Sequence, residues 1–193
     1  MKFIEGSFYH IYNRGNDKQN IFFQERNYYF FIEKIRKYIV HHADILAWCL
    51  MPNHFHLLVR ANTDSLKVVR EKPMPIVALS EGIRLLLSSY TKGIQKQEPF
   101  VGNLFQQKTK CKCADQYLNQ VFHYIHQNPF RASLVKKIED YPWVSFHEYL
   151  EIQSQTRLCN LDVAYRFLNL DKSRFVNDSY AVIPDDIMRL FEL

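Results

Sequence analysis

The chain has 193 residues and a formal net charge of +5, with 47% hydrophobic and 15% aromatic residues. This composition predicts a folded protein with a substantial core and excludes a low-complexity or disordered chain. The sequence has no apolar run of the ~18 residues that a membrane helix needs and no signal-peptide pattern after Met1. We therefore expect a cytoplasmic protein with no membrane partner.

The charge is unevenly distributed along the chain. Residues 1–150 carry 20 Lys and Arg against 13 Asp and Glu, whereas residues 151–193 carry five against seven. The segment from Arg84 to Lys112 is especially basic, with Glu98 as its one acidic residue. A basic segment beside aromatic residues suits a phosphate backbone, although a solvated helix face explains such a run equally well. The four cysteines form no C-x-x-C pair, and we expect them to be reduced and structural.

In the first third of the chain, the hydrophobic pattern predicts one helix among three strands. Residues 7–14 are aromatic and end at a Gly-Asn-Asp turn, which indicates a strand. Apolar residues at helical spacing follow over 24–42. Strands are predicted over 44–51 and 54–60, and Pro52-Asn53 joins them as a tight hairpin.

The remaining elements are predicted with the help of proline, glycine and capping residues. Residues 61–79 are irregular; a helix capped by Ser80 runs to Gln97, with Pro99 and Gly102 ending it. A fourth strand follows over 104–111. Asp115 caps a third helix that we expect to end at Asn128, because the residue before a proline disfavours the helical region. Short helices are predicted at three further places: 144–151, 161–170 and 184–193.

The order strand, helix, strand, strand, helix, strand predicts an α+β fold. It is the split βαβ order of a ferredoxin-like sandwich, an antiparallel sheet with helices on one face. We expect one domain over residues 1–150 and a helical C-terminal extension over 151–193. Fold order alone does not define a function.

Two histidines, His54 and His56, stand one residue apart in the third predicted strand. Side chains two apart in a strand share a face, so both imidazoles project together, opposite to Phe55 and Leu57. Two imidazoles on one face suit a metal ion, although ordinary surface or core-edge histidines share this pattern.

The third predicted helix carries Tyr124 and Asn128, four residues apart and therefore on one face. A lone tyrosine at that position would serve as a core-rim residue. If the helix packs over the histidine strand, the phenol and the amide converge on His54 and His56. Two imidazoles and an amide oxygen would then leave metal positions for phosphate oxygens and water.

Five segments of the sequence, in the same order, resemble the single-tyrosine HUH transposases, and within them the REP-associated tyrosine transposases. The HUH motif is His54-Phe55-His56. The segments are 9–16, 50–59, 102–106, 124–132 and 140–143, the last with Ser145 and Tyr149. Each motif is weak alone, but five in the right order are highly specific.

The resemblance implies a transposase that cleaves and rejoins single-stranded DNA at hairpin-bearing sites. It implies that His54, His56 and Asn128 bind Mg²⁺ or Mn²⁺ and that Tyr124 is the nucleophile, forming a 5′-phosphotyrosine intermediate. It leaves open a monomer or a homodimer. As lower-ranked candidates for phosphate contacts we include four basic residues: Arg14, Lys108, Lys110 and Arg131. Solvent exposure alone explains each of these four equally well.

Two other interpretations of the sequence stay open at this point. A domesticated relative would bind a DNA or RNA hairpin without cutting it. An unrelated metallohydrolase would need an acidic third ligand, for which Asp44 and Asp64 are the nearest in sequence. His10 is not expected to be a ligand, and neither His123 nor His126 is expected to be catalytic.

Overall fold

The centre of the fold is a four-stranded antiparallel sheet in the order β2-β3-β1-β6. In the computed structural model, which describes residues 1–98, 102–152 and 155–191, the strands are β1 (Phe8–Arg14), β2 (Ala43–Met51), β3 (His54–Ala61) and β6 (Lys110–Cys113). Strands β2 and β3 form the predicted hairpin, and β1 pairs with β3 so that Arg14 lies opposite His54. This is the predicted ferredoxin-like strand order.

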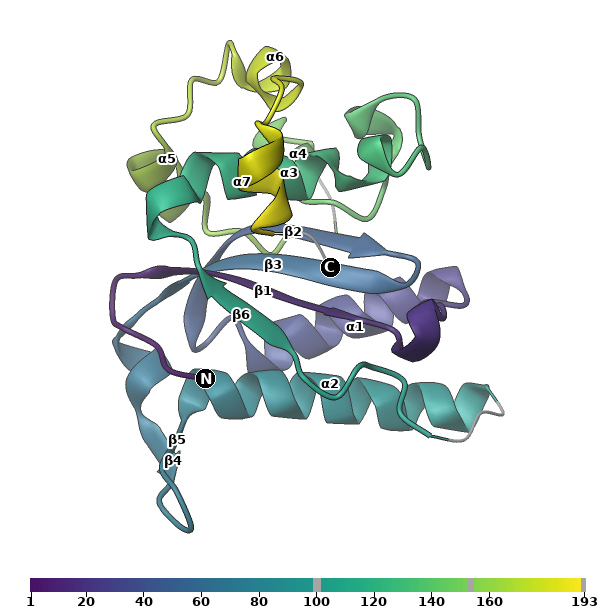
Figure 1. Ribbon diagram of the computed structural model, residues 1–193, viewed down its shortest axis with the longest axis vertical. Helices are drawn as coiled ribbons and strands as arrows, with labels where there is room; N and C mark the ends of the chain where they lie inside the picture. Colours follow the sequence, from purple (N-terminus) through teal and green to yellow (C-terminus); the bar gives the residue numbers. More distant parts are fainter. Residues whose placement is uncertain (99–101, 153–154, 192–193) are drawn as a thin grey trace.

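Helices α1 (Glu25–Tyr38) and α2 (Ala78–Gln97) cover one face of the sheet (Figure 1). The core between them contains Phe31, Ile35 and Leu86 from the helices, together with Phe55 and Leu57 from β3. The two helices approach closely at Gly82, where a Cβ atom would lie 2.2 Å from the carbonyl oxygen of Tyr38. These two core helices lie on one face, as the sequence predicts.

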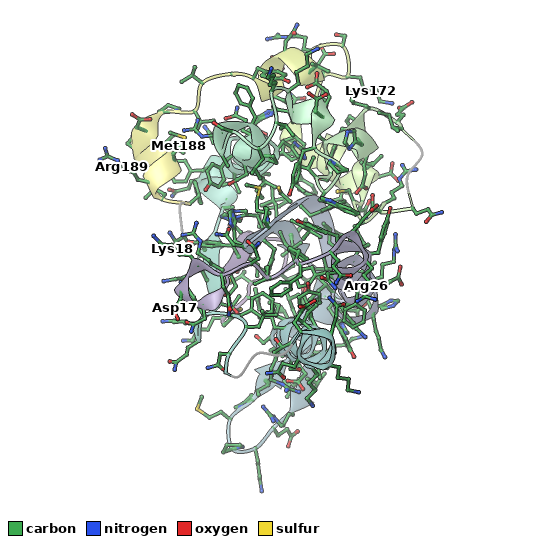
Figure 2. All side chains as sticks on the ribbon, turned by 90° about the vertical axis from the view of Figure 1, so that its right-hand side faces the viewer. Asp17, Lys18, Arg26, Lys172, Met188 and Arg189 are labelled. Carbon is green, nitrogen blue, oxygen red and sulfur yellow. The ribbon has the colours of Figure 1, made fainter. Side chains whose placement is uncertain are left out.

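The third helix, α3 (Leu118–Arg131), lies on the opposite face with the C-terminal helices (Figure 1). Those helices are α4 (Phe146–Tyr149), α5 (Leu161–Leu168), α6 (Phe175–Ser179) and α7 (Asp185–Arg189). Figure 2 shows Arg189 directed outward from α7, while the adjacent Met188 is buried. Residues from α3, α5, α6 and α7 share a second core, so the C-terminal part of the chain packs on the face that α3 covers.

Short elements connect the larger ones. A β-hairpin, β4 (Val68–Arg70) and β5 (Ile76–Val77), extends from the body beside the start of α2 (Figure 1). The 3₁₀ turns are η1 (Asn16–Lys18), η2 (Thr63–Leu66), η3 (Asp115–Tyr117) and η4 (Ile138–Asp140). Residues 61–79, predicted to be irregular, therefore contain η2 and this small hairpin. In the described part of the chain, no helix has the length and apolar character needed to cross a membrane.

Two predicted boundaries of α2 and β6 are wrong. Helix α2 begins at Ala78 rather than after Ser80, because Ala78 and Leu79 are buried and anchor its first turn in the core. The Ser80 hydroxyl instead donates to the Met1 carbonyl. The fourth strand begins at Lys110, since Leu104 and Phe105 both pack into the core and cannot alternate between two faces. Pro99, predicted to end α2, lies outside the described residues.

The predicted limits of α3 are also wrong. Asp115 does not cap it; its carboxylate accepts a hydrogen bond from the Phe8 amide at 2.6 Å and ties the start of the helix to β1. The helix continues through Pro129 to Arg131, because a proline in the last turn removes only one backbone hydrogen bond. Elsewhere α1 ends at Tyr38, and α4, α5 and α7 are shorter than predicted; α6 was not predicted.

Candidate active site

The histidines of β3 lie on the face of the sheet that α3 covers. His54 is 8% exposed and His56 fully buried, with their rings at 5.0 Å centroid distance and nearly perpendicular. Between them in sequence, Phe55 points to the opposite face and packs against Phe31. The alternation of a strand therefore separates the imidazoles from the apolar core, as the sequence predicts.

One nitrogen of His56 is engaged and the other is not. Its Nδ1 lies 2.8 Å from Nε2 of His10, which projects from β1 on the same face. Within the described residues, the buried Nε2 of His56 has no hydrogen-bond partner. A buried polar atom left unsatisfied costs about 1–3 kcal/mol, so this nitrogen is well suited to a ligand.

His54 is held by two asparagines. Its Nδ1 lies 2.6 Å from Oδ1 of Asn53, and its side chain also hydrogen-bonds with that of Asn128. Asn128 additionally donates from Nδ2 to the Tyr124 carbonyl at 2.8 Å, which orients its amide one helical turn after the tyrosine. Arg14, directly opposite His54 in β1, brings a positive charge to the same place.

The site favours neutral imidazoles. Burial and, secondarily, the charge of Arg14 lower the pKa of His54 to about 3, although the hydrogen bond with Asn128 partly opposes them. Burial, reinforced by Lys112, lowers the pKa of His10 to about 3. The pKa of His56 is well below its ordinary value, mainly through burial and secondarily through the other two histidines. Neutral imidazole is the form that binds metal ions.

Tyr124 lies against the histidines. Its ring meets that of His56 edge to face at 5.7 Å between centroids, and that of His10 at 6.1 Å. The tyrosine is only 6% exposed. Phe191, from the C-terminal segment, lies 6.4 Å from the Tyr124 ring and 5.8 Å from that of His10. The site is therefore closed on this side by Phe191, which is itself 2% exposed.

The four predicted DNA-contact residues are not all brought together. Arg14 lies beside His54, and Lys110 pairs with Tyr12 in the sheet, so both are on the site's face. Lys108 lies in the loop before β6 and lines a groove along α2 on the other side. Arg131 is exposed at the end of α3, just beyond Asn128.

The residues around the histidines fit a metal ion only if the Asn128 amide contributes. Among the residues that the structure describes, no three His, Cys, Asp or Glu side chains gather as a metal site. Asp44 is paired with Arg60 at the far end of the β2–β3 hairpin, and Asp64 with Lys67. Neither carboxylate lies beside His54, which argues against the metallohydrolase interpretation. The Nε2 atom of His56, which has no partner in the part of the chain that the structure describes, lies beside a neutral His54 and the amide, and this arrangement suits a divalent cation.

Sequence reasoning missed three residues of this site. His10 contacts His56. The signal for its position lay in the β1 sequence, where His10, Tyr12 and Arg14 share a face. Asn53 was assigned only to a turn. No sequence pattern pointed to Phe191, because its contact with Tyr124 and His10 depends on how the C-terminal segment packs. His126, which was not expected to be catalytic, bonds with Ser145, and the four cysteines, all described, form no disulfide.

The comparisons with known proteins identify the fold. No protein-family model matches the chain, and no curated protein matches it significantly in sequence. A solved structure described as "Structure of the REP associates tyrosine transposase bound to a REP hairpin" matches with a TM-score of 0.57 and 18% identity. The match covers 78% of this chain and 83% of that chain.

The chain is thus an α+β protein built on a four-stranded antiparallel sheet. More particularly, it has the fold of a REP-associated tyrosine transposase. At this identity the likeness concerns the fold, and the chemistry has to be argued from the site itself.

Proposed function

We propose that this protein binds hairpin-bearing DNA and cleaves and rejoins single-stranded DNA through a covalent tyrosine intermediate. The observation that carries the proposal is the contact between Tyr124 and His56, whose buried Nε2 lacks a partner in the described residues. A potential nucleophile and a potential metal ligand from two distant parts of the sequence thus meet. The shared fold with a hairpin-bound tyrosine transposase supports DNA as the substrate.

In the proposed reaction the Tyr124 oxygen attacks a phosphodiester. The new bond joins the phenol oxygen to phosphorus, the bond to the 3′-oxygen breaks, the phenol proton passes to water, and the leaving 3′-oxygen takes up a proton. The product is a 5′-phosphotyrosine and a free 3′-hydroxyl. Because the phosphoester energy is retained, a second 3′-hydroxyl can displace the tyrosine and rejoin the strand.

Each neighbouring residue has a defined part in this proposal. His54, His56 and Asn128 would hold Mg²⁺ or Mn²⁺; when bound, such an ion polarises the phosphate and stabilises the developing charge. The Nε2 atom of His10 holds the His56 ring at Nδ1 of His56, which leaves the buried Nε2 of His56 for a ligand. Arg14 supplies a positive charge beside His54 for a phosphate oxygen.

A second candidate is a protein that binds a DNA or RNA hairpin without cutting it. The observation in its favour is the closure of the site, since Tyr124 is 6% exposed and covered by Phe191. Under this alternative the histidines, the tyrosine and the amide would be an inherited arrangement that no longer reacts.

A covalent-adduct assay distinguishes the two candidates. The protein is incubated with single-stranded DNA that carries a hairpin, with Mg²⁺ or Mn²⁺, and run on a denaturing gel. We expect a protein–DNA adduct that Tyr124→Phe abolishes and that Tyr117→Phe, a partly buried tyrosine near Phe191, leaves intact. An adduct that persists in Tyr124→Phe contradicts the assignment of the nucleophile. Tight binding without an adduct in either metal supports the second candidate.

A further inference from the structure

A groove of about 850 Å³ runs between α2 and the loop before β6. Its walls carry hydroxyl, amide and basic side chains, and its floor includes Leu104 and Phe105. Its lining is made of residues 1, 13, 80, 83, 84, 87, 88, 91, 92, 95 and 102–109. None of these described residues is acidic. A groove rich in donors and without carboxylates suits a negatively charged chain.

Two lysines give the groove its unpaired positive charge. Lys92 on α2 and Lys108 in the loop are both exposed, and neither takes part in an ion pair with the described residues. Arg84 also lines the groove, but its guanidinium donates two hydrogen bonds to Glu81, which offsets its charge. Lys92 and Lys108 are therefore the residues that can neutralise phosphates.

The groove lies on the α2 side of the sheet, and its lining ends at Thr109, directly before the edge strand β6. Asn13, which lines it, donates from Nδ2 to the Gln106 carbonyl and to the Thr109 hydroxyl, and so fixes the loop against β1. The next residue in β1 is Arg14, beside His54. Beyond the loop, Lys110 and Lys112 lie opposite Tyr12 and His10 in the sheet, on the site's face. A strand of DNA that leaves the groove can thus cross the edge strand β6 at Lys110; Lys112 donates to the Leu190 carbonyl, and Phe191 covers His10 and Tyr124.

We propose that this groove holds the single-stranded DNA flanking the phosphate that enters the site; the identity of the ligand rests on the proposed function. The α2 wall from Ser80 to Gln95 is about 22 Å long, enough for several nucleotides. Gln95, Asn103 and Gln107 offer amides for base edges, and Lys92 and Lys108 bind phosphates. Lysines on an edge strand, here Lys110 and Lys112, also deter pairing with other chains, so Lys92 and Lys108, which lie off the sheet, are the more diagnostic residues.

The test measures binding in EDTA, where no metal-dependent cleavage occurs. Fluorescence anisotropy compares a DNA hairpin that has a single-stranded flank of about ten nucleotides with the same hairpin without a flank. We expect Lys92→Ala with Lys108→Ala to weaken binding of the flanked hairpin roughly tenfold and to leave the unflanked hairpin unchanged. The plot of the logarithm of the binding constant against the logarithm of the salt concentration should become shallower by about 0.7 for each phosphate contact removed.

Matched variants separate a groove from general electrostatics. Lys34→Ala with Lys37→Ala removes the same charge from α1, outside the groove lining, and should change binding of neither DNA. Gln95→Glu adds a charge within the groove and should weaken only the flanked hairpin. All substituted residues lie at the surface or half-buried, and unchanged melting temperatures confirm folding.

The possible results distinguish this inference from the proposed function. If the flanked and unflanked DNA lose affinity equally, or the α1 variant matches the groove variant, the groove assignment is overturned. If Tyr124 forms an adduct but the groove variants bind normally, the function stands and the groove fails. If no adduct forms but the flank-dependent loss is seen, the groove is a DNA site on a protein that does not cleave.

Discussion

The two faces of the central sheet are built from the same strands but differ in chemistry. Toward α1 and α2, strand β3 presents Phe55, Leu57 and Val59 to a continuous apolar core. Toward α3, the same strand presents His54 and His56, and β1 adds His10. Alternate residues of one strand thus face an apolar core on one side and a cluster of histidines on the other. The same strand that packs into the core therefore also fixes the positions of the polar groups.

Burial has opposite consequences on the two faces. On the apolar face it stabilises the fold by removing hydrocarbon from water. On the α3 face it leaves His56 Nε2 without a hydrogen-bond partner among the described residues and lowers the histidine pKa values. A protein retains such costs where a site needs neutral, directed ligands. The following predictions test this division, starting with the largest expected effect.

Neighbouring substitutions in β3 should have different outcomes. Phe55→Ala should lower the free energy of unfolding by about 3–5 kcal/mol, because the fully buried ring packs against Phe31 and Phe105. His56→Ala should cost less stability, about 1–3 kcal/mol from the unpaired His10. It should nevertheless reduce adduct formation below detection. Urea denaturation and the adduct gel, compared at equal folded fractions, measure the two effects.

The proposed difference between the two faces of the sheet is contradicted if the two variants behave alike. Should His56→Ala destabilise the protein as much as Phe55→Ala and retain adduct formation, the α3 face would be a second structural core. A Tyr124 adduct that survives without His56 would remove that histidine from the proposed metal site.

Stability should fall with decreasing pH because of the α3 face. The folded-state pKa values of His10 and His54 are about 3, and those of His56 and His126 are also lowered by burial. The unfolded chain takes up protons below about pH 6.5, whereas the folded state does not, so unfolding is favoured as the pH falls toward 3. The contribution is at most about 1.4 kcal/mol per histidine and pH unit.

Urea denaturation at pH 7, 6 and 5 measures this slope. Carboxylates contribute little above about pH 5, so the histidines dominate in this range. His10→Gln should reduce the slope of the unfolding free energy against pH by an amount that corresponds to at most one bound proton. A stability that does not change between pH 7 and 5 would contradict the burial of neutral histidines.

The sequence predicted the features that depend on local pattern. Strand alternation placed His54 and His56 on one face, and helical spacing placed Asn128 one turn after Tyr124. Both arrangements are present. The limits of α2 and β6 were wrong because core packing of Ala78 and Leu104 overrides the capping and alternation signals, and that of α3 because its last turn tolerates Pro129. Long-range contacts, such as Phe191 over Tyr124, have no local pattern and could not be predicted.

His10 should act as a positioning residue for His56. His10→Gln removes the ring that lies 2.8 Å from His56 Nδ1, and the freed imidazole should bind metal about 10- to 100-fold more weakly. The measurement is the rise in melting temperature with added Mn²⁺, which does not depend on cleavage. His123→Gln is the control, because His123 lies in α3 and bonds with Ser179. Equal metal responses in both variants would restrict His10 to packing.

The smallest expected effect concerns the closed side of the site. Phe191→Ala removes a ring that packs against Tyr124 and His10, and should raise the rate of adduct formation a few fold by exposing the tyrosine. Val182→Ala, at a residue 92% exposed in the same C-terminal segment, should leave the rate unchanged.

The sign of the Phe191 effect distinguishes a cover from a core residue. If Phe191 only stabilises the fold, its removal lowers the melting temperature and the adduct rate together. If it limits access, the rate rises even though some packing is lost, because the closed tyrosine must be exposed before it meets a phosphate. A faster rate with a slightly lower melting temperature would mean that the α3 face opens for function, whereas the α1–α2 face stays closed.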